Sequence, residues 1–149
     1  MTVERPVTIL ILDDDPVNRS LIRAILARAA DPGLRRATLR EAATIADARS
    51  VLAADDVDLV LLDVHLPDGL GLDLAADLDR SPAGRPAILA LTASVLPADQ
   101  QAALAAGCDA FLAKPYPPRE LIATASRLLE RRRQGSEPDG PDPGPDPGR

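Results

Sequence analysis

The sequence alternates short aliphatic runs with longer segments of helical periodicity, and this alternation constrains the fold most strongly. The clearest run is DLVLLD at 58–63, whose nearly continuous apolar character is typical of a strand covered on both faces. Four more runs predict strands at 7–12, 35–39, 87–92 and 110–113, and helical patterns follow at 17–29, 43–54, 70–79, 98–106 and 118–132. Five strands alternating with five helices predict an α/β fold with a doubly wound parallel sheet.

Polar residues follow four of the predicted strands at the point where each strand ends. Right-handed crossovers bring the carboxyl ends of all parallel strands to one edge of the sheet, where ligands bind. The residues at these ends are Asp13 with Asp14, Asp63, Thr92 and Lys114. We therefore expect acids, a hydroxyl and an amine to converge on one site.

Three carboxylates brought together at neutral pH repel one another, so the site is expected to hold a cation. An all-oxygen ligand set suits Mg²⁺, and Mn²⁺ is acceptable. His65 is the single histidine of the chain, and zinc is disfavoured because no further nitrogen or sulfur ligands accompany it. A carboxylate, a metal, a hydroxyl and an amine together suit phosphoryl transfer to an aspartate. Asp63 is the expected acceptor because it ends the central strand.

Composition limits the remaining function classes. The 149 residues suit one domain, expected over residues 1–133, and the Pro-, Asp- and Gly-rich segment 134–149 is expected to be a disordered tail. The net charge of -6 and the near absence of aromatic residues argue against nucleic-acid binding. A lone Cys108, with neither a signal pattern nor a long apolar run, predicts a cytoplasmic protein that does not enter a membrane.

Four motifs in this order resemble the CheY-like receiver domain of two-component response regulators. They are ILILDDDPVNR, LVLLDVHLPDGLG, LALTAS and FLAKPY. The resemblance covers roughly residues 8–131 and implies a flavodoxin-like fold with strand order 2-1-3-4-5. It also implies that the domain accepts a phosphoryl group from a phosphohistidine on a histidine kinase or a histidine phosphotransfer protein.

The resemblance implies a role for each residue of the site. Asp63 would be the phosphoacceptor, and Mg²⁺ would be held by Asp63, by Asp14 directly, by Asp13 through water and by the backbone carbonyl of His65. Thr92 and Lys114 would contact the phosphoryl oxygens, and the Lys114–Pro115 peptide would be cis. His65 and Ser94 lie where the family tunes dephosphorylation.

The resemblance also implies a signalling switch rather than an enzyme. Thr92 and Phe111 would be the switch residues, and the output face would be the fourth helix, fifth strand and fifth helix, about residues 98–132, which would bind a target protein. The domain would be a monomer or a phosphorylation-dependent dimer. After the last predicted helix about 15 residues remain, so we expect no attached effector domain.

Two other functions remain open. A phosphohydrolase of the haloacid dehalogenase type would use Asp13 as nucleophile and Asp15 as acid and base, although it leaves LLDVHLPDG unexplained. A receiver fold could instead act as a phosphorylation-independent interaction module, against which the complete set of acids, Thr92 and Lys114 argues. Taken alone, residues 13–15 also fit a helix N-cap cluster.

Overall fold

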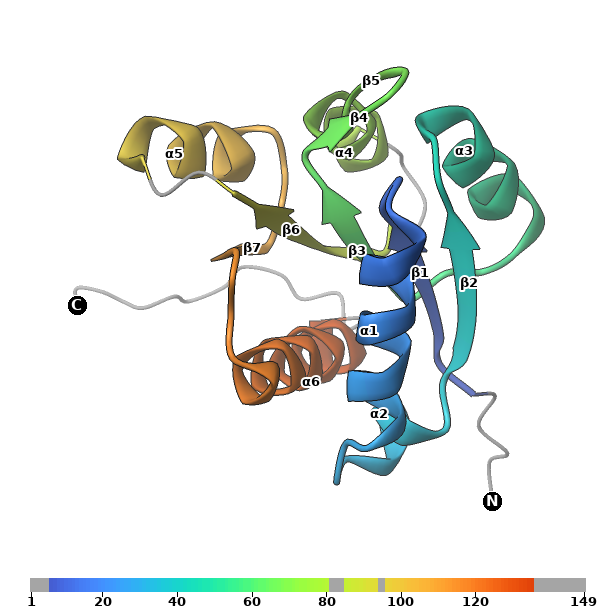
Figure 1. Cartoon of the computed structure of the whole chain (residues 1–149). Helices are drawn as coiled ribbons and strands as arrows, with labels where there is room; N and C mark the ends of the chain where they lie inside the picture. Colours follow the sequence, from blue (N-terminus) through green and yellow to red (C-terminus); the bar gives the residue numbers. More distant parts are fainter. Residues whose placement is uncertain (1–5, 81–84, 94–95, 136–149) are drawn as a thin grey trace.

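A computed structural model describes residues 6–80, 85–93 and 96–135, which form a parallel sheet between two layers of helices (Figure 1). Its strands are β1 (Thr8–Leu12), β2 (Thr38–Ala42), β3 (Leu59–Asp63), β6 (Ala87–Thr92) and β7 (Ala110–Ala113), in the order β2-β1-β3-β6-β7. A short antiparallel hairpin, β4 (His65–Leu66) with β5 (Gly69–Leu70), follows β3. Without the hairpin this is the order 2-1-3-4-5, so the predicted fold is confirmed.

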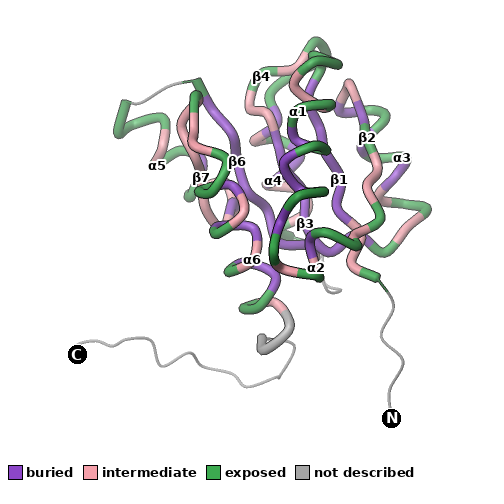
Figure 2. Tube along the Cα trace, turned by 60° about the horizontal axis from the view of Figure 1, so that its bottom comes forward, coloured by how far each residue is buried: buried purple, intermediate pink, exposed green. Residues whose placement is uncertain are grey.

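Alternate residues of the central strands enter two separate cores. One core contains Ile9, Leu61 and Leu89 and is covered by α1 (Pro16–Ala27), α2 (Pro32–Arg35) and α6 (Pro118–Gly135). The other contains Leu10, Leu62 and Ile88 and is covered by α3 (Ile45–Ala54), α4 (Gly71–Asp79) and α5 (Pro97–Ala105). β1, β3 and β6 are consequently buried along most of their length (Figure 2). Each such aliphatic side chain stabilises the fold by about 1.5–3 kcal/mol.

The segment before β2 differs from the sequence prediction. Residues 32–35 form the additional helix α2, which includes Arg35, where the strand was predicted to begin. Asp31 caps this helix by accepting a hydrogen bond from the Gly33 amide at 2.8 Å. Pro32 occupies its first turn, and Leu34 is buried in the core. The strand predicted over 35–39 therefore runs over Thr38–Ala42, in register with β1. Six helices are described where five were predicted.

Two segments of the prediction fall wholly or largely on residues that the structure does not describe. Ser94 is outside the described residues, as is the predicted tail over 134–149 except for Gln134 and Gly135, which continue α6. Within the described part of the chain, no helix is both long and apolar enough to cross a membrane.

Two carboxylates, each bonded to a backbone amide and an arginine, anchor the amino ends of the strands. Asp58 accepts a hydrogen bond from the Thr8 amide at 2.9 Å and another from the Arg132 guanidinium at 3.0 Å. Asp109 likewise accepts from the Ile88 amide at 2.8 Å and binds Arg85 through two nitrogens, at 2.9 and 3.1 Å. Each of these two carboxylates is thus satisfied by an amide and an arginine.

Gly71, the first residue of α4, lies against the backbone at Asp63, where β3 ends. A Cβ at this position would lie 2.4 Å from the Asp63 carbonyl oxygen and 2.9 Å from a methyl carbon of Leu62. The Gly71 amide also donates to the Val64 carbonyl at 2.7 Å. A residue without a side chain is therefore required for the close approach of α4 to β3.

We expect Gly71→Ala to lower the free energy of unfolding by about 1–3 kcal/mol, because backbone must move to relieve the overlap. Urea denaturation followed by circular dichroism measures this. Gly33→Ala is the comparison, since its Cβ would meet only the Asp31 side chain, at 3.2 Å and with no backbone overlap, and should lower stability by less than Gly71→Ala does. Equal stability of Gly71→Ala and wild type would contradict the proposed close packing.

Candidate functional site

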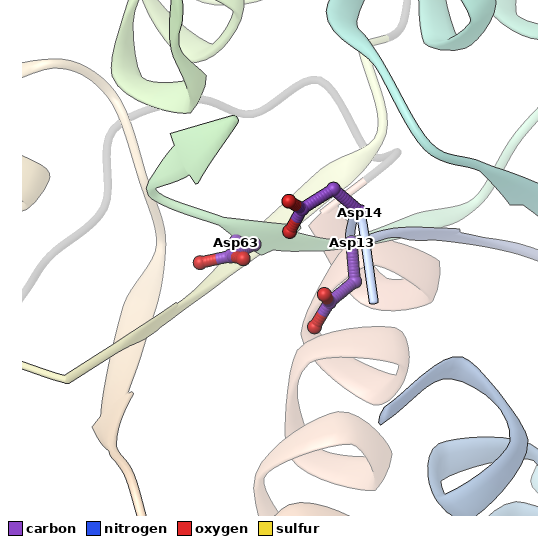
Figure 3. Close-up of side chains that lie close together, drawn as sticks. All are labelled: Asp13, Asp14 and Asp63. Atoms are coloured by element: carbon purple, nitrogen blue, oxygen red, sulfur yellow. The ribbon is translucent and has the colours of Figure 1, made fainter. Parts of the chain in front are cut away.

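Three aspartates meet at the carboxyl edge of the sheet (Figure 3). β1 pairs with β3 so that Leu12 lies beside Leu62, which places Asp13, the residue after β1, next to Asp63, the last residue of β3. Asp14 follows directly. One carboxylate oxygen from each of the three lies within 4.8 Å of the others. The convergence predicted from the strand ends is therefore present for all three acids.

The Asp13 carboxylate is only 2% exposed, and its two oxygens have different surroundings. Oδ1 accepts a hydrogen bond from the Asp15 amide at 2.9 Å. Among the described residues, Oδ2 is the one buried side-chain nitrogen or oxygen with no hydrogen-bond partner. A buried polar atom in this state carries a desolvation cost of about 1–3 kcal/mol, which a bound cation would remove.

Lys114 lies between two of the acids. Its Nζ is 3.6 Å from Asp13 Oδ2 and 3.8 Å from Asp63 Oδ1. Both distances are longer than a hydrogen bond, so the ammonium acts as a point charge shared by two carboxylates. The peptide bond that follows, Lys114–Pro115, is cis, which agrees with the resemblance.

Thr92 ends β6 and is buried beside the same edge. Its carbonyl accepts a hydrogen bond from the Lys114 amide at 2.7 Å, so the backbones of these two predicted site residues are joined directly. Phe111 lies in the neighbouring strand β7, opposite Ala90, and packs half-buried against the core under α3, α4 and α5. Its predicted role as a switch stays a prediction.

The Asp63 carboxyl is harder to ionise than an isolated aspartate. Burial raises its pKa above the ordinary value of 3.8, and the Lys114 ammonium opposes this. The Asp13 and Asp14 carboxylates raise the pKa further, while a hydrogen bond from the His65 amide, at 3.4 Å, lowers it. Crowding and burial together therefore exceed the compensation that one lysine provides.

Two other aspartates accept hydrogen bonds from amides at the starts of helices. Asp15 accepts from the Val17 amide at 2.9 Å and is the N-cap of α1, so the cap interpretation is right for this residue. Asp68, in the hairpin turn, accepts from the Ile45 and Ala46 amides at 2.9 and 3.1 Å at the start of α3. His65 is exposed in β4.

The donor set fits a hard divalent cation. It consists of oxygens from Asp13, Asp14 and Asp63, with no cysteine sulfur or histidine nitrogen among the ligand atoms that meet there. Asp13 Oδ2, which accepts no hydrogen bond, supplies a buried anionic oxygen for such an ion, directly or through water. Magnesium is the ion that this chemistry favours.

Sequence reasoning missed one residue at this edge, Arg19. Its Nη1 donates to the backbone carbonyl of Asp13 at 2.6 Å, and its Nε donates to Glu41 at 2.9 Å. The chain holds sixteen arginines, and the sequence gives a single weak sign of which one reaches the site. The available signal was its position in the first turns of the helix that follows Asp13.

The sequence matches the model of the response regulator receiver domain family over residues 9–126. Transcriptional regulatory protein GltR of Pseudomonas aeruginosa is 38% identical over 126 residues, covering 83% of this chain and 49% of GltR. Response regulator protein PilR of the same organism is 40% identical over 123 residues, covering 80% of this chain and 26% of PilR. The chain spans about half or less of the length of these relatives, so the expected absence of an effector domain stays a prediction.

Solved structures agree with the family match. The signal receiver domain of an HD domain-containing protein from Pseudomonas fluorescens Pf-5 is 26% identical, with a TM-score of 0.81 over 93% of this chain and 98% of that one. A CheY-like response regulator receiver domain protein from Methanospirillum hungatei JF-1 is 25% identical, with a TM-score of 0.76 over 87% of this chain and 98% of that one.

The raised pKa of Asp63 predicts how stability depends on pH. Because ionisation is harder in the folded state, the full stability is present below pH 3.8, the ordinary aspartate value, and falls as pH rises through the higher pKa of the folded state. Asp63→Asn removes this loss. We expect the metal-free variant to have the higher free energy of unfolding at pH 7, with the difference shrinking toward pH 4, as measured by urea denaturation with a chelator present.

Asp77→Asn is the matched control, because the pKa of Asp77 is shifted in the opposite direction from that of Asp63. Asp77 is partly exposed and bonded to Arg49, which lowers the pKa of its carboxyl, so the substitution should bring no gain at pH 7. A lower stability of Asp63→Asn than wild type at pH 7 would contradict the account based on burial and crowding.

Proposed function

The chain belongs to the response regulator receiver domain family of two-component systems, and we propose that it is a switch phosphorylated on Asp63. A histidine kinase or a histidine phosphotransfer protein would donate the phosphoryl group. The observation that carries this proposal is the arrangement of the carboxyl edge: three carboxylates share a site within 4.8 Å, and one ammonium lies 3.6 and 3.8 Å from two of them.

In the proposed transfer, a carboxylate oxygen of Asp63 attacks the phosphorus of a phosphohistidine. A phosphorus–oxygen bond forms, the phosphorus–nitrogen bond of the donor breaks, and its electron pair returns to the imidazole, which takes up a proton. Lys114 offsets negative charge on the phosphoryl oxygens, and the Thr92 hydroxyl donates a hydrogen bond to one of them. The 14% exposure of the Asp63 side chain is consistent with access by a partner.

The proposed Mg²⁺ ligands are Asp14 directly, Asp13 through water, Asp63 and the backbone carbonyl of His65. Bound Mg²⁺ would neutralise charge on the acids and on the phosphoryl oxygens. The unpartnered Asp13 Oδ2 supports this assignment, since the protein itself supplies no hydrogen bond to it. Mn²⁺ suits the same oxygen ligands.

Phosphorylation is proposed to act through Thr92 and Phe111. Thr92 would move toward the phosphoryl group, and Phe111 in the neighbouring strand would turn inward and reshape the surface of α5, β7 and α6. That surface would bind a target protein or a second phosphorylated copy. The net charge of -6 argues against nucleic acid as the partner. A cytoplasmic location is part of the proposal. The domain promotes its own phosphorylation and dephosphorylation but turns over no separate substrate.

A phosphohydrolase that uses Asp13 is a weaker candidate. It needs Asp15 as a free acid and base, and Asp15 already accepts the Val17 amide as the cap of α1. Asp13 is also nearly fully buried, which limits its use as a nucleophile. The phosphorylation-independent interaction module has no observation in its favour beyond the fold itself.

Incubation with acetyl phosphate should phosphorylate the protein when Mg²⁺ is present and not when it is chelated. Intact-mass spectrometry should show the addition of one phosphoryl group in wild type, none in Asp63→Asn, and at least a tenfold reduction in Asp14→Ala, because a metal-ligating oxygen is lost. Asp77→Asn is the control that leaves the site intact. Absence of the mass shift in wild type with acetyl phosphate, together with absence of amide NMR shifts on adding beryllofluoride, would overturn the proposal.

The same variants separate the hydrolase. Hydrolysis of a small phosphate ester that survives in Asp63→Asn but is lost in Asp13→Asn would favour that function instead.

Lys114→Arg should keep the fold and metal binding but impair the switch. A planar guanidinium is larger than an ammonium and pairs with one carboxylate rather than standing between two. We expect phosphorylation to fall by less than about tenfold, while the beryllofluoride-induced amide shifts of α5, β7 and α6 in NMR spectra fall by more than half. Shifts of wild-type size in Lys114→Arg would show that the position needs only positive charge.

A further inference from the structure

Arg19 joins the acidic cluster to the end of the edge strand β2. Its Nη1 donates to the Asp13 carbonyl at 2.6 Å, and its Nε donates to Glu41 Oε1, in β2, at 2.9 Å. The Arg19 side chain is only 18% exposed. One guanidinium thus connects the loop that carries Asp13 to the neighbouring strand.

We propose that Arg19 is a positioning residue, which holds Asp13 so that Oδ2 faces the cation site. The Asp13 amide donates to the Ala42 carbonyl at 3.0 Å, its carbonyl accepts from Arg19, and its Oδ1 accepts from the Asp15 amide. Every polar atom of Asp13 is therefore fixed except Oδ2. The inference rests on the proposed function for the identity of the cation but not for the contacts themselves.

Glu41 makes the role of Arg19 geometric rather than electrostatic. The carboxylate of Glu41 binds Arg19 through Oε1 and Arg23 through Oε2, both at 2.9 Å. Much of the Arg19 charge is therefore compensated locally and is not needed as a counter-charge for the aspartates. Its geometry matters because the planar fork reaches a carbonyl and a carboxylate at once, which a single ammonium does less well.

The two possible roles predict opposite changes in metal affinity. If Arg19 contributed only charge, its removal would reduce repulsion of a cation and tighten Mg²⁺ binding. If Arg19 positions Asp13, its removal frees the loop and weakens binding, as loss of an outer partner of a metal ligand does. The sign of the change therefore distinguishes the two.

The full chain provides a matched control in Arg23. Arg23 lies one turn further along α1 and donates its hydrogen bond to Oε2 of the same glutamate, away from the Asp13 carbonyl. Arg19→Gln and Arg23→Gln each remove one charge and one ion pair with Glu41, and glutamine retains helix propensity. Only Arg19→Gln also removes the bond to the Asp13 carbonyl.

We expect Mg²⁺ titration followed by amide NMR shifts to give about tenfold weaker binding for Arg19→Gln and a change within about twofold for Arg23→Gln. Arg19→Lys should give an intermediate loss, because charge is kept while the fork is lost. Mg²⁺ binding by Arg19→Gln that equals or exceeds that of Arg23→Gln would overturn the inference.

A metal-free measurement separates this inference from the proposed function. Hydrogen exchange of the Asp15 amide, which is bonded to Asp13 Oδ1, should be faster in Arg19→Gln than in Arg23→Gln, with similar melting temperatures for the two variants. Equal exchange rates would overturn the role of Arg19. If wild type binds no Mg²⁺, the proposed function fails, and the exchange rates alone decide whether Arg19 holds Asp13.

Discussion

The main physical constraint on the carboxyl edge of the sheet is the repulsion among three carboxylates, those of Asp13, Asp14 and Asp63. At separations near 4 Å and a surface-like dielectric, each pair of charges costs on the order of 4 kcal/mol. A parallel sheet cannot avoid the convergence once adjacent strands end in acids, because all strands point the same way. Burial adds to the cost, as the raised pKa of Asp63 records. The residues around the cluster therefore hold these like charges together against their repulsion.

The amino edge shows how the same chain treats acids that have only a structural task. Asp58 and Asp109 each receive a backbone amide and an arginine, so their charge is compensated within the protein. At the carboxyl edge, Asp13 keeps an oxygen with no hydrogen-bond partner, and one lysine stands near two acids. The difference between the edges is a deficit of positive charge at the carboxyl edge, which a bound cation could make up.

The sequence was sufficient for features that depend on local pattern. The strands over 87–92 and 110–113 have the predicted bounds, since aliphatic runs bounded by polar residues leave little choice of register. α2 was missed because an Asp-Pro-Gly turn and a one-turn helix begin with the same residues, and the burial of Leu34 decides between them. Arg19 was missed because its partner Glu41 is distant in sequence, and the bond of Asp68 to the start of α3 depends on how the loops pack.

Lys114 at the carboxyl edge and Arg85 at the amino edge interact with their carboxylates in different ways. Arg85 binds Asp109 through two nitrogens, a geometry that commits a guanidinium to one carboxylate. Lys114 instead has nearly equal distances, 3.6 and 3.8 Å, to carboxylates at the ends of two different strands, and a tight bond to neither. A compact charge in this position can be redirected to a third group at the site without first breaking a strong bond. The single lysine of the chain therefore lies where its charge is shared between two carboxylates instead of being bound to one.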